Sequence, residues 1–178
     1  MKDSELKALL DTYAIPYKKW GEGTFNDLNR AISRHECTLD TFSGKVGIIT
    51  PCIGVRILHE ISPSTIWVLK PIRHTSQTDR LFFPDLSITF CKEQLPTEKD
   101  FDVISELVRQ DLKIGANQSQ YKKVEKEKQQ KDSEQYPGMI KIFNIQVYEG
   151  YLPSHLYDTL TLTGEVLLKW ETYDPVLK

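Results

Sequence analysis

The sequence has few cysteines, no long apolar run and almost no net charge. Its three cysteines, Cys37, Cys52 and Cys91, are widely spaced and form no Cys-x-x-Cys pair, so neither a zinc site nor a disulfide framework is indicated. We interpret them as reduced thiols of an intracellular protein. No stretch approaches the roughly 20 apolar residues that cross a bilayer, and the first residues are charged rather than apolar. We therefore expect no membrane association and a cytoplasmic location by default, with an organelle as the alternative.

Charge and short motifs argue against several classes of function. The formal net charge is −2, and the lysines and arginines form no clustered face, so binding to nucleic acid is not indicated. The four histidines show no His-x3-His or His-Glu-x-x-His spacing, and no serine stands in a Gly-x-Ser-x-Gly elbow. This argues against a metalloprotease and a serine hydrolase. The glycine patterns of dinucleotide-binding and P-loop proteins are also missing from the sequence.

Two short helices are predicted at the amino-terminal end. Ser4 is placed to cap the first helix, which Pro16 stops, and Thr24 starts the second. Between them Trp20 and the glycines that follow mark a turn, in which we expect the indole to seal the helices onto the rest of the protein. We assign residues 1–44 to an N-terminal helical extension.

Beyond residue 44 the sequence changes to β-branched and aromatic runs separated by Gly, Pro and Ser/Thr clusters, which is typical of strands. The expected strands are Val46–Ile49, Ile53–Leu58, Ile66–Leu69, Leu86–Phe90, Met139–Tyr148 and Leu160–Trp170. A helical pattern lies between the fourth and the fifth. Strands on both sides of one helix, with two helices in front, predict an α+β protein rather than a doubly wound sheet. We assign residues 45–178 to this second domain.

The segment from Leu95 to Gly115 carries the clearest helical pattern. Thr97 is placed to cap the helix, and Asp100 can reach back as in a capping box. Apolar residues then recur at three- and four-residue spacing, which predicts one buried stripe. These residues are Phe101, Ile104, Leu107, Val108, Leu112 and Ile114. Gly115 is placed to end the helix in a left-handed turn.

A charged run from Lys122 to Glu134 follows this helix. It alternates lysines with glutamates, aspartate and glutamines and has almost no apolar residues, so it cannot bury itself. We interpret it as a solvated insertion or a helical excursion held by i,i+4 charge pairs, within an insertion at about 118–135. A dedicated binding tail is the alternative.

The order of these landmarks resembles the Nudix proteins, and more narrowly a plant- and cyanobacterium-type branch with its own N-terminal extension. The resemblance runs nearly from end to end, and it depends on the sequential order of short segments. These are Trp20-Gly21-Glu22-Gly23, Leu86-Ser87-Ile88-Thr89-Phe90, Tyr136-Pro137-Gly138, Gly150-Tyr151-Leu152-Pro153, Tyr157-Asp158-Thr159 and Trp170-Glu171. The resemblance implies a Nudix-like α/β/α sandwich with a mixed sheet, carrying the N-terminal helices as an extension.

The Nudix box, Gly-x5-Glu-x7-Arg-Glu-U-x-Glu-Glu-x-Gly-U with U a bulky apolar residue, fits best when it ends on Ile114. In order, its defined positions then fall on Lys92, Glu98, Glu106, Leu107, Val108, Gln110, Asp111, Lys113 and Ile114. The first and last glycines, the arginine and all three helical glutamates are therefore replaced, the third of these glutamates by the shorter acid Asp111. What remains is Glu98, the apolar positions and the shortened acid Asp111.

These losses bear on the metal chemistry that the resemblance implies. The family presents glutamates one helical turn apart, so that their oxygens converge on Mg²⁺ bound to a diphosphate, and the metal activates water for attack. With Leu107 and Gln110 at two ligand positions, only Asp111 could hold the metal directly. Glu106 points about 100° away from residue 107 around the helix. Catalysis in the family manner is therefore not expected.

Three functions remain open. The first is a catalytically inactive Nudix-like protein that binds other proteins or serves as a structural subunit of an assembly, with no cofactor. The second is a Mg²⁺-dependent hydrolase of nucleoside diphosphate-linked compounds that uses Asp111 and Glu98, with carboxylates such as Glu93 or Glu165 recruited from elsewhere.

The third is a module that binds a nucleotide without turnover. In it Arg73 and Arg80 would clamp the phosphates of a small-molecule nucleotide. Aromatic side chains, among them Trp67, Phe82 and Phe83, would stack on the base. Solubility of an ordinary loop is the competing interpretation of the two arginines.

Overall fold

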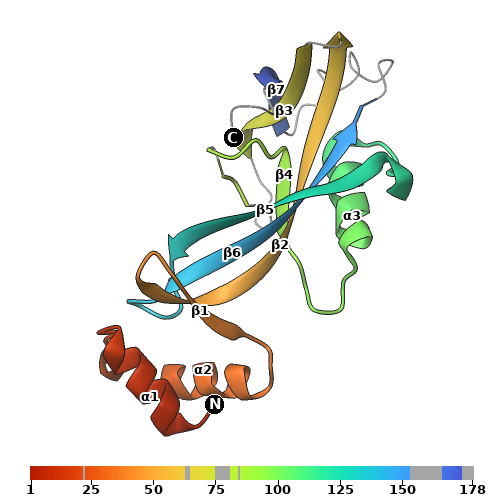
Figure 1. Ribbon diagram of the computed structural model, residues 1–178. Coiled ribbons are helices and arrows are strands. Elements are labelled where there is room, and N and C mark those ends of the chain that lie inside the picture. Colours follow the sequence, from red (N-terminus) through yellow and green to blue (C-terminus); the bar gives the residue numbers. More distant parts are fainter. Residues whose placement is uncertain (22, 63–64, 75–80, 84, 153–165, 174–178) are drawn as a thin grey trace. The chain divides into compact units, whose positions relative to one another are not determined.

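The computed structural model describes residues 1–21, 23–62, 65–74, 81–83, 85–152 and 166–173, while the side chains of 61, 71–74 and 166–169 lie outside the description. Its helices are α1 (Asp3–Thr12), α2 (Thr24–Ser33) and α3 (Asp100–Leu112), with 3-10 turns η1 (Tyr17–Lys19) and η2 (Gln118–Gln120). The strands are β1 (Thr38–Phe42), β2 (Lys45–Ser62), β3 (Thr65–His74), β4 (Phe90–Glu93), β5 (Tyr121–Asp132), β6 (Ile140–Tyr151) and β7 (Val166–Tyr173) (Figure 1).

Strand β2 organises the sheet. Three strands, β1, β4 and β3, pair antiparallel with successive segments of β2. Strand β6 lies on its other side, in the order β5-β6-β2-β3-β7. Gly54 lies against Ile145, and the Leu152 N–H donates to the Leu58 carbonyl at 2.8 Å, so residue numbers rise together along β2 and β6. These two strands are parallel, the sheet is mixed, and the α+β prediction is confirmed.

The chain divides into two compact units. The first comprises residues 1–50 and 128–144, and the second comprises residues 51–127 and 145–178. Strands β2, β5 and β6 contribute residues to both units. The predicted domain boundary after residue 44 stays a prediction.

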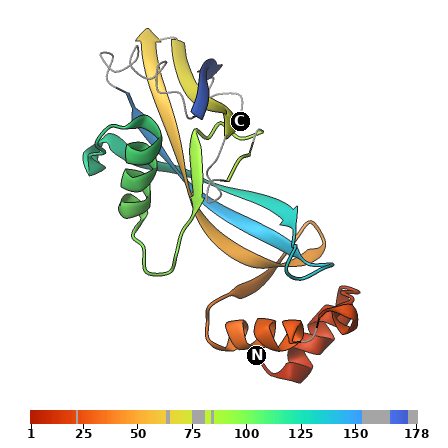
Figure 2. The same cartoon turned by 180° about the vertical axis from the view of Figure 1, so that it is seen from behind.

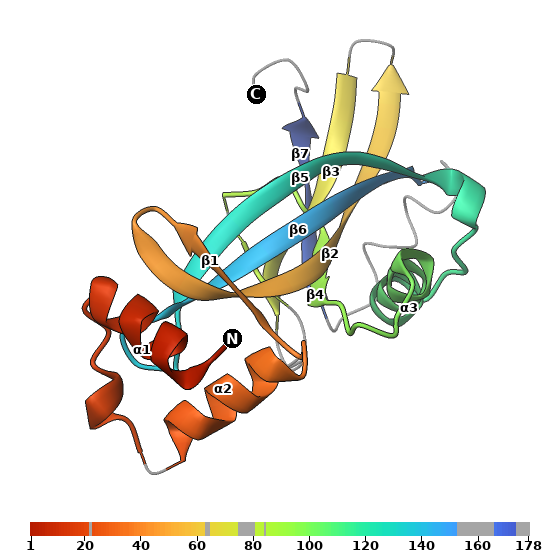
Figure 3. The ribbon, with the colours of Figure 1, turned by 60° about the horizontal axis from the view of Figure 1, so that its bottom comes forward.

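In the first unit, α1 and α2 pack on the hairpin that β1 forms with the start of β2 (Figure 3). Its buried core consists of Leu6, Leu10, Ile15, Leu28, Val46, Tyr136 and Met139. The Trp20 indole donates to the Pro137 carbonyl at 2.9 Å, and its ring lies 5.6 Å from that of Tyr136. Within the first unit, this tryptophan therefore joins the helical segment to the turn between β5 and β6, as expected.

In the second unit, α3 packs against strands of the sheet through its apolar stripe (Figures 1 and 2). The buried residues of this core are Ile53, Val55, Ile57, Leu69, Phe90, Val103, Ile104, Leu107, Val108, Leu112 and Leu152. The amphipathic pattern therefore predicted correctly which face of α3 is buried.

The helix limits differ from the predicted ones. Helix α1 begins at Asp3, with Lys2 rather than Ser4 as its N-cap. Helix α3 begins three residues after Thr97, which is not its cap, because the Glu98 carboxylate instead accepts from the Leu95 N–H at 2.7 Å and holds that turn outside the helix.

The charged run is the largest correction. Residues Tyr121–Asp132 form neither a helix nor a loop but strand β5, paired with β6 at the end of the strand order. The Gln146 amide donates to the Glu125 carbonyl at 2.6 Å, and the Tyr121 ring packs over Gly150, where an added Cβ would lie 2.4 Å from it. A strand needs no apolar residues of its own when its neighbour supplies the hydrogen bonds, and lysines are common on outer strands.

Three smaller differences concern strands. The predicted strands Val46–Ile49 and Ile53–Leu58 are parts of one continuous strand, β2. Strand β4 begins only at Phe90, and β1 was not predicted. The start of the predicted strand Leu160–Trp170 lies outside the described residues, which resume with β7 at Val166.

Over the residues that the structure describes, no helix is both long enough and apolar enough to span a lipid bilayer.

Candidate functional site

Helix α3 and the strand before it bring the residues aligned with the Nudix box together. Strand β4 places Lys92 opposite Ile53 of β2. The Lys92 ammonium lies 2.5 Å from Glu106 Oε2 and 3.8 Å from Glu98 Oε1. The side chains of Lys92, Glu98 and Glu106 are exposed by 15%, 23% and 29%, so these contacts are largely shielded from water. A lysine at the position of the first glycine of the box thus lies between two acids of the same segment.

The remaining oxygens of these two acids are also engaged. Glu106 Oε1 accepts a hydrogen bond from the Gln110 amide at 2.9 Å. Glu98 Oε2 accepts the bond from the Leu95 N–H at 2.7 Å. Both carboxylates therefore have definite protein partners on each oxygen.

A second hydrogen-bonded group holds the start of α3. Asp100 Oδ1 accepts from the Gln94 amide at 2.8 Å, and Oδ2 accepts from the Tyr148 hydroxyl. These bonds, the one from Tyr148 above all, lower the pKa of the Asp100 carboxyl. Burial and the same bond raise the pKa of Tyr148 to about 12. Asp100, predicted to reach back as a cap, instead joins α3 to β6.

Asp111, the expected metal ligand, lies on the buried side of α3 and is 6% exposed. Leu107, one turn before it, is fully buried in the core. Within the described ranges of the chain, no group of three or more His, Cys, Asp or Glu side chains is arranged to hold a metal ion.

The donor set along α3 does not fit Mg²⁺. Octahedral magnesium requires hard oxygen donors and usually at least one or two well-placed carboxylates. Gln110 offers only an amide, Leu107 offers nothing, and the nearest acidic pair surrounds the Lys92 ammonium. An ammonium repels a second cation at this distance. The residues at the box positions therefore favour an internal lysine over a divalent metal.

The C-terminal end of α3 keeps one backbone property of the box. Lys113, at the position of the last glycine, has a φ of 58° and ends the helix in the left-handed conformation. This turn was expected at Gly115, which is two residues too late. A lysine here accepts a backbone conformation that glycine adopts without cost.

The other predicted site residues are not brought together by the described part of the structure. Arg73 lies in β3, where its backbone is paired with Leu167 of β7, while its side chain lies outside the description. Arg80 and Glu165 lie outside the described residues. Phe82 is 47% exposed in the segment before β4. The predicted phosphate clamp therefore stays a prediction.

Sequence reasoning missed a buried arginine. Arg56 in β2 is 1% exposed. Its guanidinium donates to Glu149 at 2.6 Å, to the Tyr173 hydroxyl at 2.8 Å, to the Ser87 carbonyl at 2.5 Å and to Glu125. Burial opposes its charge, but the bonds to Glu149 and Glu125 outweigh burial and raise the pKa of Arg56. The signal was one charged residue inside the apolar run Ile53–Leu58.

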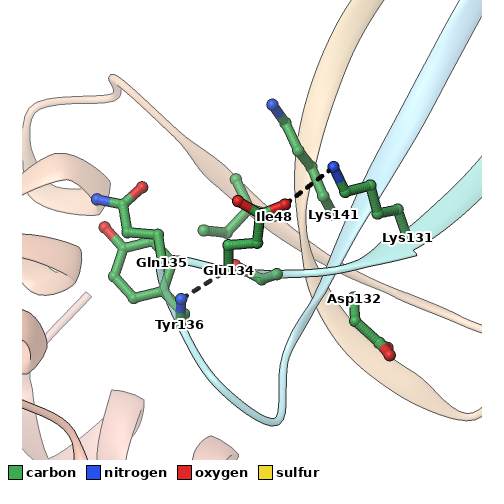
Figure 4. A pocket seen from close by; sticks show the side chains of 8 residues that line it. Ile48, Lys131, Asp132, Glu134, Gln135, Tyr136 and Lys141 are labelled. Carbon is green, nitrogen blue, oxygen red and sulfur yellow. Dashed lines mark hydrogen bonds and ion pairs between the residues drawn. The ribbon is translucent and has the colours of Figure 1, made fainter.

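A cavity of about 230 Å³ lies in the first unit, at the turn between β5 and β6. Its charged lining is balanced, and Lys131 lies 3.2 Å from Glu134 (Figure 4). Asp132 of the lining lies 3.7 Å from Lys45, which is outside the lining. Lys141 lines the same cavity. With both signs present, the cavity has no preference for an anion.

Comparisons with known proteins give structural similarity without sequence relatives. No family model matches the chain, and no curated protein matches it. Among solved structures the chain is similar to an Ap4A hydrolase of C. elegans (15% identity, TM-score 0.39, covering 68% of this chain and 79% of that one). It is also similar to a binary complex of a C. elegans Ap4A hydrolase (14%, 0.37, 70% and 80%).

A MutT/nudix family protein from Enterococcus faecalis is a further structure of this kind (8% identity, TM-score 0.40, covering 82% of this chain and 50% of that one). Of these three solved structures, two are Ap4A hydrolases and one is a protein of the MutT/nudix family, which this sequence resembles.

Proposed function

We propose that this chain is a catalytically inactive Nudix-like protein that binds other proteins or serves as a structural subunit of a larger assembly. The single observation that carries the inactive half is the position of Lys92 between Glu98 and Glu106. A tethered ammonium at this place supplies the positive charge that the acids of a diphosphate hydrolase would otherwise draw from metal.

The electrostatic argument has two parts. A cation that is covalently attached loses no translational freedom when it pairs with the acids, so a free ion must displace it at a disadvantage. The pair is also shielded, since neither Lys92 nor Glu106 is exposed by more than 29%, and shielded charges interact more strongly than surface charges. A magnesium ion would have to overcome both the tethering of the lysine and the strength of the shielded ion pair.

The protein-binding half is supported by the surface of β5. This outer strand presents lysines to the solvent, and no other strand of the described residues covers it. A Nudix-like chain without its metal ligands keeps a stable scaffold on which such a surface can be held.

The test of inactivity is a hydrolysis panel of nucleoside diphosphate-linked compounds with Mg²⁺ or Mn²⁺. We expect no turnover by the wild-type protein and none by Asp111→Asn from the same preparation. Turnover by the wild type that Asp111→Asn abolishes would show that the box works and that Asp111 holds the metal. Turnover that survives Asp111→Asn but is lost in Glu98→Gln would point to a different set of acids and also contradict the proposal.

The test of the binding role is native purification from cells that make the protein. We expect a partner at fixed stoichiometry, retained equally by the wild type and Asp111→Asn because the box is not involved. Deleting residues 122–134 would remove most of strand β5, so surface substitutions are the suitable way to disturb the interface. A monomeric protein that carries no partner from its own cell would count against the role.

A further inference from the structure

We propose that strand β5, over residues 121–127, docks an extended acidic segment of a partner protein by strand addition. This inference rests on the proposed protein-binding function and names the surface and the partner chemistry. All of these residues belong to the second unit.

The position of β5 makes strand addition geometrically open. It is the first strand in the order β5-β6-β2-β3-β7, and within the described part of the chain only β6 pairs with it (Figures 1 and 3). A strand with one neighbour carries alternate backbone N–H and C=O groups on its second edge, and these can pair with another extended chain.

The charge of β5 differs between its two faces. On one face Lys122, Val124 and Lys126 are exposed, Val124 by 40%. On the other face Glu125 is 26% exposed and bonded to Arg56, so this acid is engaged inside the protein. The side chains available to an added strand are therefore Lys122, Val124 and Lys126 on one face and Lys123 on the other.

This pattern disfavours two antiparallel registers of pairing with a second copy of the same chain. When two copies pair antiparallel with Val124 at the centre, Lys122 of one copy stands opposite Lys126 of the other. When Lys126 is at the centre, the two Lys126 residues stand opposite each other. Like charges directly opposite on one face of a sheet destabilise the pair. A partner with Glu or Asp at alternate positions turns each of these contacts into an attraction.

Nucleic acid is the weaker alternative. This part of β5 offers no arginine and only Lys122, Lys123 and Lys126 as cations, whereas affinity for a phosphate backbone grows with the number of phosphates that are neutralised. The net charge of the whole chain is −2, which gives no general attraction for a polyanion. An acidic peptide needs only the local lysines and the outer backbone edge of β5.

The experiment measures binding of a labelled peptide with alternating Glu and Val, flanked by Thr, by fluorescence anisotropy at low salt. We expect saturable binding to the wild type and at least about tenfold weaker binding to Lys122→Glu/Lys126→Glu. The matched control is Lys18→Glu/Lys19→Glu, which reverses two exposed lysines of η1 and should bind as the wild type does. Circular dichroism and thermal melting establish that both variants are folded.

Two further arms separate strand addition from simple charge attraction. A peptide of the same charge with a central proline cannot complete the backbone pairing and should bind at least about tenfold more weakly. Hydrogen exchange of the backbone amides of residues 121–127 should slow when the alternating peptide is bound.

Equal binding of the proline peptide, or equal loss in the two double variants, would overturn the proposal. A uridine oligonucleotide that binds more tightly than the peptide and loses affinity in Lys122→Glu/Lys126→Glu would assign the strand to nucleic acid instead. If no peptide binds while the hydrolysis panel stays negative, strand docking is wrong and the inactive assignment stands.

Discussion

Two clusters in the second unit each place one cation between two glutamates, and they differ in what the cation is and how deeply it lies. Arg56 is 1% exposed and faces Glu125 and Glu149. Lys92 is 15% exposed and faces Glu98 and Glu106. The arginine joins residues of β2, β5, β6 and β7, whereas the lysine joins β4 to α3 and the turn before it.

The two cations differ in whether a metal ion could replace them. The planar guanidinium of Arg56 donates in several fixed directions and also lies 5.0 Å from the Tyr173 ring, a geometry that no spherical ion reproduces. The Lys92 ammonium is a point charge with rotatable donors. Among oxygen ligands such a charge resembles a metal ion, so only the lysine cluster is a position where metal and side chain compete.

Removing Arg56 should give the largest effect. Arg56→Met leaves Glu125 and Glu149 around a buried apolar side chain, and we expect a loss of about 3–5 kcal/mol in the free energy of unfolding. Urea denaturation followed by circular dichroism measures it. The control is Arg30→Met, whose pair with Asp27 is exposed by 59% and 60% and should contribute about 1 kcal/mol or less. Similar losses in both variants would contradict the assigned role of Arg56.

Removing Lys92 should give a smaller loss together with a new property. Lys92→Met leaves Glu98 and Glu106 without their shared cation, and we expect a loss of about 1–3 kcal/mol. Millimolar Mg²⁺ or Mn²⁺ should then raise the Tm of the variant but not that of the wild type, because binding to the native state stabilises it. Lys99→Met, at an exposed lysine just before α3, is the control. A Tm of the wild type that rises with the metal concentration would contradict the claim that Lys92 excludes a metal ion from Glu98 and Glu106.

Asp100 differs from the glutamates of both clusters, because its carboxylate is held by the neutral donors Gln94 and Tyr148. Tyr148→Phe removes the hydroxyl that donates to Asp100, and we expect a loss of about 1 kcal/mol near neutral pH. Because the pKa of Asp100 is lowered in the native state, the stabilisation is present above its ordinary pKa and is lost as pH falls through the native value.

The pKa of Tyr148 determines how this stabilisation changes at alkaline pH. Its pKa is raised to about 12, so the stabilisation is present below about pH 10, the ordinary tyrosine value, and is lost as pH rises toward 12. The difference between the wild type and Tyr148→Phe should therefore shrink at both ends of the pH range. Unfolding free energies measured at acidic, neutral and alkaline pH test this, and a difference that does not vary with pH would contradict the bond.

The smallest expected effect concerns the second lysine that stands in place of a glycine. Lys113 has a φ of 58°, so Lys113→Gly relieves a strained backbone while adding freedom to the unfolded chain, and we expect a gain of about 1 kcal/mol or less. Lys92→Gly, at the other glycine position of the box, should instead destabilise. Calorimetry measures the change in Tm of each variant relative to the wild type. A change of the same sign in both variants would contradict the different roles assigned to the two lysines.

The sequence predicted elements wherever side-chain periodicity and burial agree. The apolar stripe that includes Ile104 and Leu107 is buried as expected. The prediction from sequence was wrong at Tyr121–Asp132, which forms a strand. The partner of an outer strand is a distant segment, and without that partner an alternation of charged residues resembles a solvated helix. The cap of α3 was misplaced for a related reason, since Glu98 bonds the preceding turn and Asp100 is drawn to Tyr148.

Residue identity and spacing alone place Lys92, Leu107 and Gln110 at positions where the resemblance to the Nudix box implies a glycine and two glutamates. Three other features became visible only in the folded chain. Lys92 lies between two acids, Arg56 binds Glu125 and Glu149, and the charged run forms the outer strand of the sheet. Each of these joins segments far apart in the chain, and such contacts depend on how the strands pair rather than on local preference.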